Sequence, residues 1–127
     1  MSKGLEGIVA ASTKLSDVRG QEGVLIYNGY NINDLAGHVS FEEVVHLLHH
    51  GTLPNRAQLD ELNSTLRGLR ELPQGVIEII KTLPADAPPM HAIRTAVSAL
   101  GCTDSNADEQ SQANQERQAL RLIAQLP

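Results

Sequence analysis

The sequence predicts an all-α fold, mainly helical, with a small β-hairpin or arm near its N-terminus. The 127 residues include one Phe, two Tyr and no Trp, so Leu, Ile, Val and Ala must build the core, which suits helix packing. From Ser40 onward, apolar residues recur at the i, i+3, i+4, i+7 spacing of one helical face. Before Asn31, two β-rich runs flank a glycine-containing loop.

The composition restricts the class of protein. The formal net charge is -5, and general nucleic-acid binding needs clustered Lys and Arg facing phosphates. No apolar run approaches the ~20 residues of a membrane span, and the start lacks the apolar core of a secretory signal. The one cysteine, Cys102, cannot form an internal disulfide, which is typical of reducing compartments. We therefore expect a cytoplasmic single domain with neither nucleic-acid nor membrane partners.

Residues 1–30 form the predicted β-arm. The run from Ile8 to Val18 is rich in β-branched residues, and the loop RGQEG separates it from the run VLIY. Strand, glycine-rich loop and strand predict a hairpin. Asn28 and Gly29 then supply an Asn-Gly turn signal. An irregular arm is the alternative, because two strands alone are only marginally stable.

Residues 31–127 are predicted to form consecutive helices. Ser40 and Glu43 have the spacing of a capping box, and Gly51 is placed to end the helix that follows. The predicted core-facing residues of this helix are Phe41, Val44, Val45 and Leu48.

Three further helical segments follow in the sequence. Asn55 and Gln58 repeat the capping pattern, and the next stripe consists of Leu59, Leu62, Leu66 and Leu69. A shorter helix over residues 73–82 is predicted to bury Val76, Ile77, Ile80 and Leu83. Another helix starts at Met90, and a polar stretch then leads into ALRLIAQLP.

The segment FEEVVHLLHH carries three histidines. Glu42, His46 and His50 lie one helical turn apart, opposite the apolar stripe, and His49 lies at its margin; carboxylate and imidazole at this spacing can share a metal. The order differs from the HExxH zinc motif, and a closed structural zinc site usually has four ligands. We therefore expect no metal. The prediction is a solvated polar face, with His50 complementing the helix dipole.

The segment PMHAIRTAVSALG, residues 89–101, is apolar or small almost all round. Only His91 and Arg94 are plainly polar, so it lacks the charged face of a surface helix and belongs in a buried position. Few other helices in so short a chain could surround it. The sequence therefore predicts a second chain or further sequence against it, and a central helix of this domain alone is the alternative. The predicted contact residues of a homodimer are Met90, Ile93, Ala96, Val97 and Leu100.

Taken in order, these segments resemble the N-terminal part of a bacterial citrate synthase. The resemblance runs from GLEGIVAA through LIYNGYNINDLA and SFEEVVHLLHHGTLPNRAQLDEL to LPADAPPMHAIRTAVSALG and ALRLIAQLP, and it covers essentially the whole chain. Family members commonly carry an aromatic residue where His49 stands, which agrees with a histidine face that binds no metal. Many also carry a histidine where this chain has Pro88.

The resemblance implies an all-α homodimer with a small β-arm, in which this region belongs to the large helical domain. The family are acyltransferases of the tricarboxylic acid cycle, which condense acetyl-CoA with oxaloacetate to citrate and CoA without a metal. One His and one Asp convert the acetyl group to an enol, while another His polarises the oxaloacetate carbonyl. Those residues lie in later motifs of relatives. The resemblance therefore assigns this chain no catalytic residue and no metal, and it identifies no CoA-binding residue.

We therefore expect an N-terminal fragment of a citrate synthase, which supplies fold and dimer scaffold and is inactive by itself. The nearest alternative is a fragment of a 2-methylcitrate synthase acting on propionyl-CoA, because the pocket residues that separate the two are absent from this region. From other classes, the alternatives are a non-catalytic helical interaction module and a His-rich metal-binding module.

Overall fold

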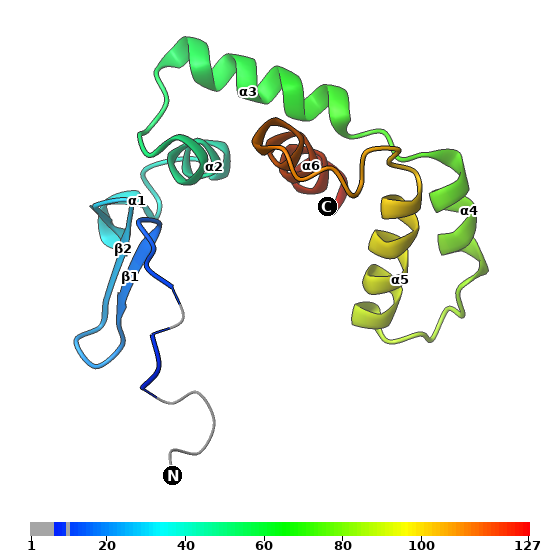
Figure 1. Ribbon diagram of the computed structural model, residues 1–127, viewed down its shortest axis with the longest axis horizontal. Coiled ribbons are helices and arrows are strands. Elements are labelled where there is room, and N and C mark those ends of the chain that lie inside the picture. Colours follow the sequence, from blue (N-terminus) through cyan, green and yellow to red (C-terminus); the bar gives the residue numbers. More distant parts are fainter. Residues whose placement is uncertain (1–6, 10) are drawn as a thin grey trace. The chain divides into compact units, whose positions relative to one another are not determined.

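The computed structural model describes residues 7–9 and 11–127, which form a small sheet followed by helices (Figure 1). The strands are β1 (Ser16–Arg19), β2 (Val24–Tyr27) and β3 (Tyr30–Asn31). The helices are α1 (Ile32–Leu35), α2 (Phe41–His50), α3 (Arg56–Leu69), α4 (Gln74–Thr82), α5 (Pro89–Cys102) and α6 (Gln112–Gln125). The mainly helical fold class predicted from the sequence is confirmed. None of the described helices is long and apolar enough to cross a membrane.

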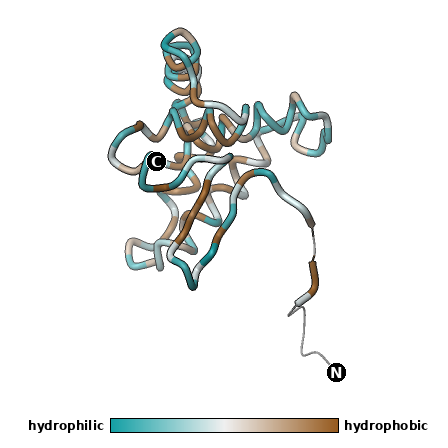
Figure 2. The backbone as a smooth tube through the Cα atoms, turned by 90° about the vertical axis from the view of Figure 1, so that its left-hand side faces the viewer, coloured by the Kyte–Doolittle hydropathy of each residue, from teal (hydrophilic) through white to brown (hydrophobic). Residues whose placement is uncertain are grey.

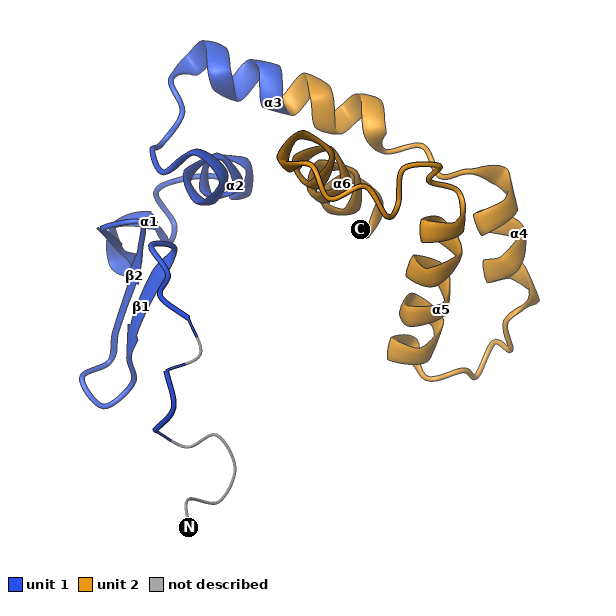
Figure 3. Ribbon diagram, viewed as in Figure 1, with its two compact units in different colours: residues 1–62 blue, residues 63–127 orange. Residues whose placement is uncertain are grey.

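The chain divides into two compact units, unit 1 (residues 1–62) and unit 2 (residues 63–127), coloured separately in Figure 3. The predicted β-arm lies within unit 1, and helices α4, α5 and α6 lie within unit 2.

An antiparallel hairpin opens the sheet of unit 1. β1 pairs with β2, from Ser16 opposite Tyr27 to Arg19 opposite Val24. The residues of β2 are half-buried, whereas β1 is exposed along its length; Figure 2 shows the hydrophobic colour along β2 and a hydrophilic loop before it. The hairpin is confirmed, but the strand predicted from Ile8 begins only at Ser16 among the described residues, because β2 offers four residues to pair.

An Asn-Gly turn joins β2 to β3, as the sequence predicts. Asn28 and Gly29 have φ angles of 44° and 89°, and positive φ at both central residues suits the twist of a two-residue hairpin. The backbone N–H of Asn28 donates to the carbonyl oxygen of Leu15 at 3.0 Å. Its side-chain Nδ2 donates to the carbonyl oxygen of Leu47 at 2.7 Å. The side-chain amide of Asn28 thus links the β2–β3 turn to the C-terminal end of α2.

Helix α2 begins and ends where the sequence predicts. The Ser40 hydroxyl accepts from the Glu43 N–H at 3.2 Å, and the Glu43 carboxylate accepts from the Ser40 N–H at 2.6 Å. This second bond is the largest cause of a lowered pKa at Glu43. At the other end, Gly51 adopts a φ of 81° and its N–H donates to Leu47 O at 2.8 Å. The chain can therefore leave the helix through a left-handed residue at no steric cost.

The core-facing stripe predicted for α2 is partly wrong. Phe41 is 67% exposed, whereas Val45, His46 and Leu47 are buried. Leu35, on α1, is also buried, and α1 packs against β2 and β3. Contacts reach α2 from two sides, the hairpin turn and the loop after the helix, so its buried surface is wider than one stripe.

The helices of unit 2 bury Leu66, Val76 and Leu100. Helices α4 and α5 lie side by side (Figure 1). The helix predicted over residues 73–82 is confirmed to within one residue. Its predicted burial of Ile80 is wrong, because that side chain is 40% exposed and faces a groove.

Candidate interaction surface

An apolar groove of about 280 Å³ lies between α4, α5 and the end of α6. Its floor is formed by Val76 and Leu100, which are buried. Ile93 and Leu126, which also line it, are 47% and 52% exposed. The remaining lining residues include Leu72, Ile80, Ala92, Ala96 and Val97. Large apolar side chains left half in water at a concave surface are typical of an interaction site.

Helix α5 presents opposite faces to the groove and to solvent. On a helix that advances 100° per residue, the lining residues of α5 lie opposite Arg94, Thr95 and Ser98, which are exposed. The Thr95 hydroxyl donates to His91 O at 2.9 Å, and the Ser98 hydroxyl donates to Arg94 O at 3.0 Å. Both hydroxyls therefore hydrogen-bond within their own helix.

The predicted homodimer contact set divides into three groups in the structure. Ile93, Ala96 and Val97 line the groove, and Met90 is 71% exposed on the first turn of α5. Leu100 lines the groove but is only 5% exposed, so it belongs to the core of unit 2, and its part in a contact between copies stays a prediction. Leu100 lies near the C-terminal end of α5, and it also lines a second pocket with residues of the following loop and of α6.

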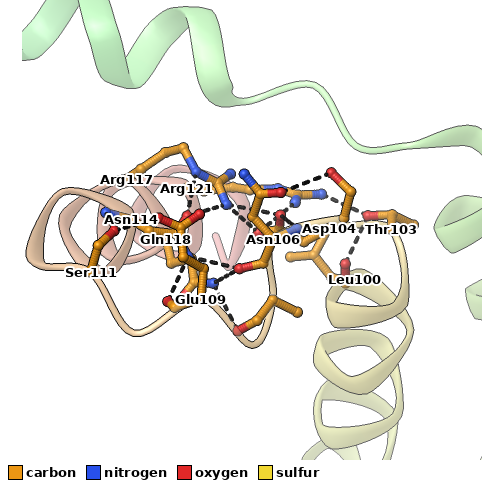
Figure 4. A network of polar contacts seen from close by, with 12 residues as sticks. Leu100, Thr103, Asp104, Asn106, Glu109, Ser111, Asn114, Arg117, Gln118 and Arg121 are labelled. Carbon is orange, nitrogen blue, oxygen red and sulfur yellow. Dashed lines mark hydrogen bonds and ion pairs between the residues drawn. The ribbon is translucent and has the colours of Figure 1, made fainter.

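A relay of hydrogen bonds connects the end of α5 to one wall of the groove, and Figure 4 shows its first members, Leu100, Thr103 and Arg121. The Thr103 hydroxyl donates to Leu100 O and accepts from Arg121 Nη2, both at 2.7 Å. Arg121 Nε donates to Gln125 Oε1 at 3.0 Å, and Gln125 Nε2 donates to Glu71 O at 2.7 Å. These bonds tie α6 to the end of α5 through Arg121 and to the segment before α4 through Gln125, which lines the groove.

The loop between α5 and α6 is held by a second set of polar contacts (Figure 4). Arg117 Nη2 donates to both carboxylate oxygens of Asp104, at 2.8 and 2.7 Å. Asn114 is 5% exposed; its Nδ2 donates to Asn106 O and Glu109 O, and its Oδ1 accepts from Arg117. The hydrogen bond from Arg117 lowers the pKa of Asp104, with a smaller contribution from the Asn106 N–H.

The prediction of a solvated histidine face is wrong for His46. His46 is 6% exposed, and its Nδ1 lies 2.8 Å from Thr52 O, so Nδ1 carries the proton because a carbonyl only accepts. His49 and His50 are exposed, and the His46 and His50 ring centroids are 4.4 Å apart. Within residues 7–9 and 11–127, no group of three or more His, Cys, Asp or Glu side chains is placed to hold a metal ion.

Sequence reasoning missed the contribution of α4 and the end of α6 to the groove. Ile80 and Leu126 line it and are half exposed, at 40% and 52%. The available signal was the run IEII in α4, which is more apolar than one core-facing stripe requires.

Comparison with known proteins identifies the group to which this arrangement belongs. The family described as "Citrate synthase, C-terminal domain" matches residues 4–127. The chain belongs to the citrate synthase family. It is 40% identical to citrate synthase of Haloferax volcanii over 131 residues, covering 100% of this chain and 35% of that protein. It is 42% identical to 2-methylcitrate synthase 2 of Corynebacterium glutamicum, covering 98% of this chain and 33% of that protein.

A citrate synthase of Thermoplasma acidophilum shares the fold, with a TM-score of 0.88 and 27% identity. The match covers 98% of this chain and 32% of that one. Its structure is a ternary complex with carboxymethyl coenzyme A and oxaloacetate. The chain described here spans about a third of the length of the curated relatives that it matches.

Proposed function

We propose that this chain forms part of the helical scaffold of an enzyme that condenses acetyl-CoA with oxaloacetate to give citrate and CoA. Within that scaffold, the groove face of α5 is where two copies of the chain meet. The observation that carries the proposal is the apolar groove of unit 2, with Ile80, Ile93 and Leu126 half exposed, in a chain of the citrate synthase family.

Burial of apolar surface supplies the driving force for this contact. A large apolar side chain gains about 1.5–3 kcal/mol when it is fully buried, so three half-exposed side chains on each copy represent several kcal/mol. Association costs about 4 kcal/mol or more in translational and rotational freedom. A two-fold dimer counts each side chain twice, because closed symmetry presents the same patch on both copies. Ala96 is small enough to let two backbones approach there.

Light scattering at micromolar concentration tests this contact. We expect a dimer of the unmodified chain and a weakened dimer of Ala96→Glu, because two like charges would be buried against each other. Ser98→Glu, on the opposite face of α5, is the matched control and should remain dimeric. A monomeric unmodified chain would contradict the proposal, as would an Ala96→Glu chain that is folded and fully dimeric.

In the whole enzyme, this chain would supply scaffold and the rest of the protein would supply the catalytic residues. Residues 1–30 act as a β-arm, residues 31–127 contribute to the large helical domain, and the catalytic His and Asp residues lie elsewhere in the enzyme. By itself the 127-residue chain is then inactive. A thiol-release assay with acetyl-CoA and oxaloacetate should stay at background, and turnover that co-purifies with the chain would overturn this assignment.

A 2-methylcitrate synthase is a second candidate, supported by 42% identity to a named 2-methylcitrate synthase against 40% to a named citrate synthase. The two activities differ in the acyl-CoA, propionyl or acetyl. Measuring kcat/KM for both acyl-CoA substrates in the full-length enzyme separates them. A higher value for propionyl-CoA would replace the first candidate with the second.

A further inference from the structure

We propose that Asn28 is a deamidation site whose reaction the folded hairpin holds back. Asn28 is followed by glycine, and every other asparagine in the sequence is followed by a larger residue. A glycine leaves the next peptide nitrogen open to close approach, so Asn-Gly pairs are especially prone to deamidation. The inference does not depend on the proposed function, because Asn28 and Gly29 lie in unit 1 and the groove lies in unit 2.

The reaction needs only water and base from solvent. The deprotonated Gly29 amide nitrogen attacks Cγ of Asn28, the new N–Cγ bond forms, and the Cγ–Nδ2 bond breaks as Nδ2 leaves as ammonia. Water then opens the five-membered succinimide ring. Addition at Cγ gives aspartate, and addition at the backbone carbonyl carbon gives isoaspartate. The sum is exchange of one amide for one carboxyl group, with no change in oxidation state. Gly29 is exposed, so solvent reaches the nucleophile.

Two hydrogen bonds hold Asn28 away from this path. Its backbone N–H is bound to Leu15 O at 3.0 Å, and its Nδ2, the leaving group, is bound to Leu47 O at 2.7 Å. The side chain is half-buried, and the turn holds Asn28 at a φ of 44°. Ring closure moves Cγ onto the next nitrogen and so breaks the bond to Leu47 O. The reaction therefore proceeds through local opening of the hairpin.

The products cannot restore the contact that Asn28 makes. A carboxylate at this position has no proton to donate, and it would face the Leu47 carbonyl at the negative end of the α2 dipole. An isoaspartate also lengthens the backbone within a two-residue turn, which is incompatible with the pairing of Tyr27 and Tyr30. Deamidation thus converts a reversible opening of the hairpin into a permanent one.

Incubation of the full chain at mildly alkaline pH tests whether deamidation of Asn28 requires local opening of the hairpin. One sample stays folded and one is held unfolded in urea, and fragment mass spectrometry follows each asparagine. In the unfolded sample we expect Asn28 to convert faster than any other asparagine. In the folded sample Asn28 should convert at least about tenfold more slowly than in urea, since reaction then requires opening. Equal rates in the two samples, or faster conversion of another asparagine in urea, would overturn the proposal.

Two variants test the consequence by amide hydrogen exchange over the last turn of α2. Asn28→Asp reproduces the charge of the product, whereas Asn28→Gly removes the amide without adding charge and tolerates the positive φ. We expect Asn28→Asp to lose more protection than Asn28→Gly. Wild-type protection in Asn28→Asp would overturn the proposed effect of the product. If Asn28→Gly loses as much protection as Asn28→Asp, then repulsion between the carboxylate and the Leu47 carbonyl contributes nothing to the loss.

Discussion

Asn114 carries an unusual share of the contacts that shape the α5–α6 loop. Its amide donates to two backbone carbonyls of the loop, Asn106 O at 2.7 Å and Glu109 O at 2.9 Å, while its oxygen accepts from Arg117. Because Asn114 is only 5% exposed, water cannot easily replace these hydrogen bonds. A buried polar side chain of this kind stabilises one loop conformation, because any other conformation leaves carbonyl groups without donors.

Replacing Asn114 by alanine should therefore destabilise the fold. We expect Asn114→Ala to lower the free energy of unfolding by about 1–3 kcal/mol, the usual cost of leaving buried partners without a hydrogen bond. Urea denaturation measures the change. Gln112→Ala, on the exposed first turn of the same helix, is the control and should change stability by no more than about 0.5 kcal/mol. Equal stability of both variants would show that water replaces the Asn114 amide.

Asp104 makes this same loop sensitive to acid. Its folded-state pKa lies below the usual value, so the folded chain binds fewer protons there than the unfolded chain. The stabilisation is therefore fully present above the unfolded pKa, near 3.9, and is lost as pH falls through the lower folded value.

Asp104→Asn, which cannot ionise, should reveal this dependence. We expect the difference in unfolding free energy between the wild-type chain and Asp104→Asn to be largest at neutral pH and to shrink as pH falls below the usual aspartate pKa. Denaturation curves over a pH series provide the measurement. A difference that stays constant with pH would mean that the charge of Asp104 contributes nothing to its pairing with Arg117.

At the scale of elements, reciprocal caps define where two helices start. At the start of α2, the side chains of Ser40 and Glu43 each accept a hydrogen bond from the other residue's backbone N–H. Asn55 and Gln58 make the same reciprocal pair before α3, at 2.9 and 3.0 Å. Each pair satisfies N–H groups that the first turn of a helix leaves without partners. These limits were predictable, since every group involved lies within four residues of the others. The length of β1 was not, because it depends on the strand that pairs with it.

Removing the cap of α2 should cost about 1 kcal/mol, within the range of 0.5–2 kcal/mol typical of such caps. The test is Ser40→Ala, followed by denaturation. Ser64→Ala is the matched control, because Ser64 is exposed inside α3, where alanine is the better helix former. A Ser40→Ala chain as stable as the Ser64→Ala control would mean that water substitutes for the serine hydroxyl.

At the scale of the whole molecule, the large apolar side chains of the groove remain partly in water. Ile80, Ile93 and Leu126 are each at least 40% exposed, although unit 2 buries Val76 and Leu100 almost fully. A fold of this size gains most of its stability from burial, so a second copy on this face would add to stability through mass action.

The thermal unfolding midpoint should therefore rise with the concentration of the chain. Association selects the folded state, and its contribution grows with concentration. Scanning calorimetry at several concentrations measures this rise, and Ala96→Glu should abolish it while Ser98→Glu preserves it. A midpoint that is independent of concentration in the unmodified chain would contradict association through α5.

Sequence and tertiary structure each determined separate parts of this protein. The limits of α2 and α4, the Asn28–Gly29 turn and the mainly helical class were predictable because they depend largely on residues close together in the chain. The burial of His46 and the inward position of Leu100 followed from what packs on those helices. A helix pattern defines which residues share a face, but a neighbouring segment decides which face is covered, and that segment lies outside the pattern.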